Sequence, residues 1–286
     1  MKPKVSIVST ALFAAFAASV CGSAFAQSAT PAQSLLEDKF VVNVGAFVMS
    51  SDLSGRLNGE AVTNPDVDFD KVFGRASDAT RVRADALWRV TPNHHLRFMY
   101  FDNSTTRSRV LDQTLEWGDY SFQVGGKVEL QNKLRIFELA YEYALLRSPD
   151  YEVSASLGVH YLDMSIRLSG AANVTDSNGN VTSVSAASSA KSVPAPLPVI
   201  GLRAGWAVSP QWYLDAQGQY FKASVDGYNG YISDLRVGAT WMYSQNFGLG
   251  IGYNRFVTNV DVGRASFDGR LRVGYSGVQV YLTGAY

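Results

Sequence analysis

The chain has 286 residues with 25 basic and 25 acidic side chains, and it contains 25 glycines but only 9 prolines. This balanced charge gives no support for a nucleic-acid partner, because nucleic-acid-binding domains carry clustered basic charge. Beyond the N-terminal region, no segment approaches the roughly 20 continuous apolar residues of a membrane-spanning helix. The exported chain is therefore either a water-soluble fold or a closed β-barrel.

The N-terminus has the features of a secretory signal peptide. A short basic start, MKPK, precedes a mostly apolar run over residues 5–20, and the sequence AFAQ at 24–27 supplies the small residues that a signal peptidase reads. We predict a signal peptide over residues 1–26, and the alternative is a buried N-terminal helix. The one cysteine, Cys21, lies inside this segment, so we expect a mature chain without disulfides.

The remaining chain consists of segments of about 10 residues in which apolar and polar side chains alternate. The clearest is QWYLDAQGQYFK at 211–222, and similar segments occur at 40–48, 81–90, 137–145, 153–161, 200–208, 235–243, 247–253 and 277–286. An alternation of period two predicts β-strands with two unlike faces.

Short and long connections alternate between these strands. The tight turns are TPNHH, RSPDY, VSPQ and SQNFG, and the longer polar connections cover residues 50–78, 104–126, 169–195, 224–229 and 260–269. Four tight turns and five longer loops give ten strands, with eight and twelve as alternatives. We expect a solvated loop at 171–195, strand extensions within 50–78 and no helical domain.

Two all-β folds compete for this pattern, a secreted β-sandwich and a transmembrane barrel. Glycine and other small residues on the polar faces, together with the alternation of short and long connections, favour the barrel. Aromatic residues at the ends of the apolar faces are typical of the girdles at membrane interfaces. The predicted girdle consists of Trp88, Tyr143, Tyr161, Trp206, Trp212, Tyr243 and Tyr286. We predict an antiparallel up-and-down barrel over residues 40–286 and a short periplasmic segment at 27–39, with short periplasmic turns and long extracellular loops.

The sequence AFAQ, the ten alternating segments and the terminal YLTGAY together resemble the small bacterial outer-membrane β-barrel proteins. This class includes the OmpA-type transmembrane domain and the opacity-type barrels, and the resemblance identifies no closer family. It implies a location in the outer membrane of a Gram-negative bacterium, in contact with lipid and lipopolysaccharide. It also implies that the barrel-assembly machinery reads the C-terminal strand, where Tyr286 takes a position most often held by Phe.

The last strand must pair with the first, because an open strand edge is not tolerated in hydrocarbon. We expect Val278, Val280 and Leu282 to face lipid. The side chains between them, Gln279 and Tyr281, are then expected to face the lumen.

Charged side chains occupy the faces that we predict to point into the lumen. They are Arg81, Arg83, Asp85, Arg89, Arg97, Glu138, Glu142, Arg203, Asp215 and Arg236. Buried charges must be paired or meet water, so we expect the carboxylates to bind the arginines. An ionic plug with a structural or surface role is the first interpretation. The alternative is a narrow, mildly anion-preferring channel for small solutes or ions.

The sequence gives little support for catalysis, and we predict neither enzymatic activity nor a cofactor or metal ion. His94 and His95 are assigned to a tight turn, and His160 and Asp163 are expected on opposite faces of one strand. A barrel hydrolase, such as an omptin-like protease, is therefore the least favoured hypothesis.

Overall fold

The computed structural model describes residues 29–58, 63–74, 79–175, 180–225, 228–264 and 267–286. Within these ranges the elements are α1 (Pro31–Glu37), β1 (Phe40–Leu57), β2 (Val67–Asp68), α2 (Phe69–Phe73), β3 (Ala79–Arg89), β4 (His94–Val110), β5 (Leu115–Trp117), β6 (Tyr120–Phe122), β7 (Lys127–Arg147), β8 (Tyr151–Thr175), β9 (Val181–Ala207), β10 (Trp212–Val225), β11 (Tyr228–Met242), β12 (Phe247–Arg264) and β13 (Phe267–Ala285). The predicted signal peptide at 1–26, including Cys21, lies outside the described residues. No helix in the described ranges is long and apolar enough to cross a membrane.

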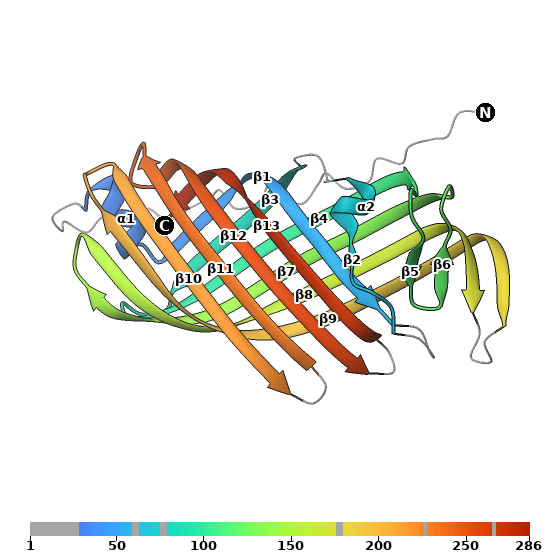
Figure 1. Ribbon diagram of the computed structural model, residues 1–286. Helices are drawn as coiled ribbons and strands as arrows, with labels where there is room; N and C mark the ends of the chain where they lie inside the picture. The colour runs from blue at the N-terminus through green and yellow to red at the C-terminus, as the bar shows by residue number, and fades with distance from the viewer. Residues whose placement is uncertain (1–28, 59–62, 75–78, 176–179, 226–227, 265–266) are drawn as a thin grey trace.

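Ten of these strands form a closed antiparallel ring in the order β1, β3, β4, β7, β8, β9, β10, β11, β12, β13 (Figure 1). β13 pairs with β1 from Ala285 opposite Val41 to Gly269 opposite Leu57. This pairing of the last strand with the first closes the ring, as the sequence predicts. Backbone groups along both strands are therefore hydrogen-bonded, which a barrel in hydrocarbon requires.

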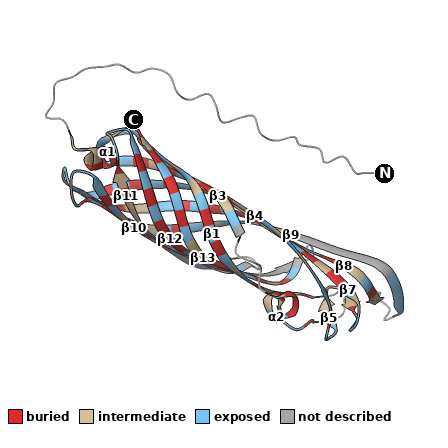
Figure 2. Ribbon diagram, turned by 90° about the horizontal axis from the view of Figure 1, so that it is seen from above, coloured by how far each residue is buried: buried red, intermediate tan, exposed pale blue. Residues whose placement is uncertain are grey.

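The outer face of the ring is apolar, and the inner face carries the buried side chains. On β13, Val280 and Leu282 are 50% and 68% exposed, whereas Gln279 and Tyr281 are 2% and 1% exposed. Figure 2 shows the same alternation of exposed and buried residues along β1, β12 and β13. An exposed band of valine, leucine and aromatic residues around a closed barrel is a surface suited to lipid.

Aromatic residues lie at both edges of this apolar band. Of the predicted girdle, Tyr161 lies at one edge, and the other six lie at the edge that carries the tight turns and the C-terminus. Beyond the Tyr161 edge, the next outward-facing position on nine of the ten strands is polar. These positions are Ser50, Thr80, Asp102, Arg135, Asp163, Lys222, Ser233, Arg255 and Ser276. This change marks the outer boundary of the apolar band. Short turns face the periplasm in outer-membrane barrels, so we call the end with the tight turns the periplasmic end.

The outer connections are built largely from extensions of the strands. The sequence predicts a solvated loop at 171–195, and this is wrong: β8 continues to Thr175, and β9 begins at Val181. The two strands remain paired up to Thr175 opposite Val181. The hydrogen bonds between paired strands use only backbone groups, so a run of serine and alanine can form strands. Such a run has no alternating apolar pattern, and a sequence-based prediction of strands depends on that pattern.

A short helix replaces part of the wall at the outer end. β3 reaches only as far as Ala79 opposite Met49, so the outer part of β1 has no β3 residues beside it. Asp70 of α2 accepts a hydrogen bond from the Leu53 backbone N at 2.8 Å and binds Arg107 of β4 at 2.7 Å. The α2 segment therefore bridges β1 and β4 where β3 is absent.

Apolar side chains fill the outer half of the interior, and we call this cluster the apolar core. It includes Phe47, Met49, Phe101, Ile136, Leu162, Phe256 and Tyr275 inside the ring, and Phe69, Trp117 and Phe122 above it. Trp117 of the β5–β6 hairpin is fully buried against Phe69, with ring centroids 5.2 Å apart. The Gly118 N–H donates to the Leu57 carbonyl at 2.9 Å, which ties this hairpin to the end of β1.

Two single glycine-to-alanine substitutions test the packing of side chains in the lumen. A Cβ at Gly250 would lie 2.2 Å from the Tyr281 ring, whereas a Cβ at Gly218 would meet nothing within 4 Å. We expect Gly250→Ala to lower the free energy of unfolding by about 1–3 kcal/mol through overpacking. Gly218→Ala is the matched control and should stay near the wild type. The urea midpoint of unfolding in detergent is measured for both variants by the mobility shift on unheated gels. Equal midpoints would contradict close packing of Gly250 against Tyr281.

Candidate functional site

A layer of buried charged side chains fills the periplasmic half of the lumen. Glu142 is 0% exposed and accepts hydrogen bonds from Arg97 Nε at 2.6 Å and Arg203 Nε at 2.8 Å. Arg97 also lies 2.8 Å from Glu138, and Arg203 lies 2.5 Å from Glu152. These residues come from β4, β7, β8 and β9, so the pairs cross-link four strands.

A second group of charges lies on the opposite wall. Asp85 of β3 forms ion pairs with Arg83 and Arg236, both at 3.1 Å. Arg83 also donates to Asn254 at 2.7 Å, and the guanidinium of Arg236 lies 5.8 Å from the centre of the Tyr281 ring. Both groups use inward-facing strand positions, so the period-two pattern brings the opposite charges together. We call the two groups, with Arg89, the ionic layer.

The structure places most of the predicted lumen residues in this layer, but not all of them. Eight are buried, namely Arg83, Asp85, Arg89, Arg97, Glu138, Glu142, Arg203 and Arg236. Arg81 and Asp215 are only partly buried. Arg81 donates to Asn103 and to the Ser104 carbonyl rather than to a carboxylate. Among the described residues, Asp215 forms no ion pair.

Three buried ionisable residues of the described ranges were not predicted to lie in the lumen: Glu152, His95 and Asp234. Glu152 follows directly after the RSPDY turn, where the alternation already predicts an inward side chain. The assignment of His94 and His95 to a tight turn is wrong, because they are the first two residues of β4, and His95 is 0% exposed. Its Nδ1 lies 3.6 Å from Glu152. His94, by contrast, is exposed and contacts Tyr141.

Helix α1 covers the periplasmic mouth of the barrel. Pro31 at its start and the reciprocal capping of Thr30 and Gln33 favour a helix in this short segment. Its residues Ala32, Leu35 and Leu36 are buried in a cluster with Val41, Ala207, Tyr213, Met242 and Ala285. The predicted periplasmic segment at 27–39 therefore contains a helix that packs into the mouth of the barrel.

Arginine side chains fix the C-terminal end of α1. Arg89 donates to the Leu35 carbonyl at 2.7 Å and to the Asp38 carbonyl at 2.8 Å, and Arg147 donates to the Leu36 carbonyl at 3.3 Å. Cations at a helix C-terminus satisfy carbonyls that lack intrahelical partners and oppose the helix dipole. These contacts join α1 to the ionic layer.

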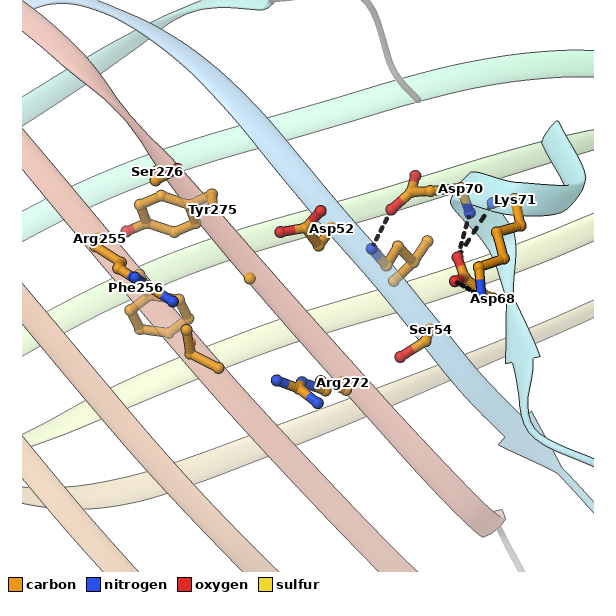
Figure 3. A pocket seen from close by; sticks show the side chains of 13 residues that line it. Asp52, Ser54, Asp68, Asp70, Lys71, Arg255, Phe256, Arg272, Tyr275 and Ser276 are labelled. Carbon is orange, nitrogen blue, oxygen red and sulfur yellow. Dashed lines mark hydrogen bonds and ion pairs between the residues drawn. The ribbon is translucent and has the colours of Figure 1, made fainter. Parts of the chain in front are cut away.

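A groove of about 540 Å³ lies at the outer end, between α2 and strands β1, β12 and β13 (Figure 3). Its lining mixes both signs of charge with serine and aromatic groups. The charged lining residues are Asp52, Asp68, Asp70, Lys71, Arg255 and Arg272. The two arginines lie on β12 and β13 and the carboxylates on β1, β2 and α2, so the groove presents both signs of charge.

A comparison with solved structures gives the class of the fold. The outer membrane protease OmpT from Escherichia coli aligns over 86% of this chain and 96% of its own, with 12% identity and a TM-score of 0.54. The chain has the fold of the small bacterial outer-membrane β-barrels. At this identity the likeness to OmpT extends to the barrel fold alone.

Two other barrels align more loosely. The toluene transporter TbuX of Ralstonia pickettii is 12% identical over 90% of this chain and 92% of its own, with a TM-score of 0.38. Ail, the attachment invasion locus protein of Yersinia pestis, is 7% identical over 86% and 99%, with a TM-score of 0.31. No protein family and no curated protein matches the barrel by sequence.

The ionic layer predicts that replacing a buried arginine lowers the free energy of unfolding much more than replacing an exposed lysine. Arg203→Ala leaves Glu142 and Glu152 buried with fewer partners, so we expect a loss of about 3–5 kcal/mol in the free energy of unfolding. Lys71→Ala removes an ion pair to Asp68 whose lysine is 84% exposed, so we expect less than about 1 kcal/mol. Urea unfolding of both variants in the same detergent measures the difference. Similar losses would mean that the buried pairs are screened by water.

Proposed function

We propose that this barrel is a closed, non-conducting protein whose role is structural or lies in interactions at the cell surface. The observation that carries this proposal is that three successive layers occupy the lumen. From the periplasmic end these are helix α1, the ionic layer and the apolar core. A solute would have to disturb each layer in turn to pass.

The energetics of the two inner layers support closure. Moving an arginine away from Glu142 would leave a buried charge without its partner, at a cost of several kcal/mol. Water and ions are also excluded from an apolar core whose residues pack in contact. Neither layer therefore opens at small cost, and this favours the plug over the narrow channel.

The outer end supports a surface role. Strands β8 and β9 continue well past Tyr161, and the groove beside α2 lies in this outer part. Arg255 and Arg272 line the groove on the same strands whose apolar positions meet lipid. Guanidinium groups there favour contact with the phosphates of lipopolysaccharide. We propose that the surface ligand is a molecule that carries both positive and negative groups and binds over this groove.

We also propose that the barrel is not an enzyme. His94 is in the periplasmic part, and His95 and His160 are buried inside the lumen. A hydrolase at the outer rim that used histidine as its general base would need one that substrate can reach, and no histidine meets this condition.

Bilayer recordings test closure. The purified mature barrel in planar bilayers should give no stable current, because the ionic layer and the apolar core remain in place. Deletion of residues 31–37 removes α1, and this variant should also stay silent if the other two layers seal the lumen. A reproducible open current of fixed size in the wild type would overturn the proposal and favour the channel.

The C-terminal residue provides a test of assembly. Tyr286 exchanges two backbone hydrogen bonds with Phe40, at 2.7 and 2.8 Å, and its ring lies edge-on to Phe247 at 6.2 Å. Deletion of Tyr286 should lower the amount of folded barrel in the outer membrane, because closure of the ring and recognition by the assembly machinery both use this end. Tyr286→Phe keeps the ring and is the control. Wild-type levels after deletion would contradict the proposed assembly signal.

A further inference from the structure

Three ligand-type side chains converge where the ionic layer meets the apolar core. Glu138 of β7, His160 of β8 and Asp234 of β11 each offer one atom, and these atoms all lie within 4.8 Å of one another. The three residues are 3%, 0% and 2% exposed. Glu138 and His160 are opposite each other on the neighbouring strands β7 and β8, and closure of the ring brings Asp234 of β11 to them.

The atoms that face one another include more hydrogen-bond acceptors than donors. Glu138 Oε2 and Asp234 Oδ2 are buried without a hydrogen-bond partner. His160 Nε2 lies 3.2 Å from Glu138 Oε2 and 3.0 Å from Gln219 Oε1, so one ring N–H faces two acceptors. A buried acceptor without a donor costs about 1–3 kcal/mol, and more when it is charged. One N–H of His160 is therefore shared, and Asp234 Oδ2 has no donor.

Asp234 differs from the other buried carboxylates. Asp85, Glu138, Glu142 and Glu152 each form an ion pair with at least one arginine. Asp234 receives a hydrogen bond from Asn254 at 2.5 Å, and no ion pair joins it to a cation in the described part of the chain. A buried carboxylate without a cationic partner must either take up a proton or gain a counter-charge.

The geometry points to a bound transition-metal ion of the zinc class. One imidazole nitrogen and two carboxylate oxygens are ligands that zinc takes in proteins, with water in the fourth position. Two ligands of a tetrahedral zinc ion lie roughly 3.3 Å apart when the metal–ligand bonds are about 2.0–2.1 Å. The separation of 3.2 Å between His160 Nε2 and Glu138 Oε2 fits this value. We propose that Glu138, His160 and Asp234 bind zinc inside the lumen.

Neighbouring side chains hold two of these ligands in place. Glu138 Oε1 accepts hydrogen bonds from Gln219 at 2.7 Å and lies 2.8 Å from Arg97, which leaves Oε2 directed at His160. The His160 ring stacks on Phe256 with an interplanar angle of 5° and a centroid distance of 6.1 Å. Such outer contacts orient metal ligands and raise affinity.

The ion would act as a cross-link across the lumen. β7 and β8 are neighbours in the ring, whereas β9 and β10 separate β8 from β11. A metal bound to all three strands would therefore join two parts of the wall. In a lumen closed as proposed above, the ion would enter during folding. Binding to the folded state alone raises stability in proportion to the logarithm of metal concentration.

Zinc content and thermal stability together test this site. The untagged mature chain is unfolded in urea with a chelator, refolded into detergent with zinc sulfate, and passed over a desalting column. Elemental analysis should give about one zinc per folded chain. Refolding with zinc should also raise the temperature at which the folded band is lost on gels, relative to refolding with the chelator.

Variants separate this site from adventitious binding. Asp234→Asn keeps the shape of the side chain and its place beside Asn254, and it should lower zinc affinity at least about tenfold, as should His160→Ala. His95→Ala removes the other buried histidine, and His94→Ala removes the exposed one, so both controls should retain zinc. If His160→Ala does not fold, Asp234→Asn alone decides. No zinc in the folded wild type, or equal zinc in Asp234→Asn, would overturn the proposal.

Discussion

The pairing of β13 with β1 is the interaction on which the rest of the structure depends. In hydrocarbon every backbone N–H and C=O needs a partner within the protein, and a sheet meets this condition only when its two edges join. The continuous register from Val41 opposite Ala285 to Leu57 opposite Gly269 provides that closure. Once the ring is closed, the alternation along each strand determines which side chains meet lipid and which enter the lumen.

The lumen is divided along its axis into regions of different chemistry. Charges near the periplasmic end form pairs that use both oxygens of Glu142, while the outer half packs aromatic rings such as Phe47, Phe101 and Tyr275 at centroid distances of 5.0–5.8 Å. The ionic layer fixes which strands face one another, because its pairs have specific partners. The apolar core contributes burial and excludes water from the outer end. Both regions oppose an open passage.

The proposed zinc site lies where these two regions meet, and that position explains its chemistry. On the periplasmic side, arginines neutralise the carboxylates. On the outer side, Phe256 and Tyr275 stack with an interplanar angle of 11° and exclude solvent. Asp234 lies between the two, buried but without an arginine. The low dielectric constant of such surroundings strengthens any interaction with a cation.

The sequence by itself determined the barrel, its ring of strands and most of its lumen charges, because a period of two is visible in residues such as Leu282 and Tyr281 without knowledge of strand partners. It missed the strand extensions near Val181, since small polar residues pair through their backbones and leave no apolar pattern. It also missed the role of α1, because seven residues give too weak a helical signal without the barrel mouth against which Leu35 and Leu36 pack. Which arginine meets which carboxylate, and that Asp234 meets His160 rather than an arginine, was decided only by the tertiary structure. The physical reason is that strand order, tilt and register set distances across the lumen, and these depend on closure of the whole ring.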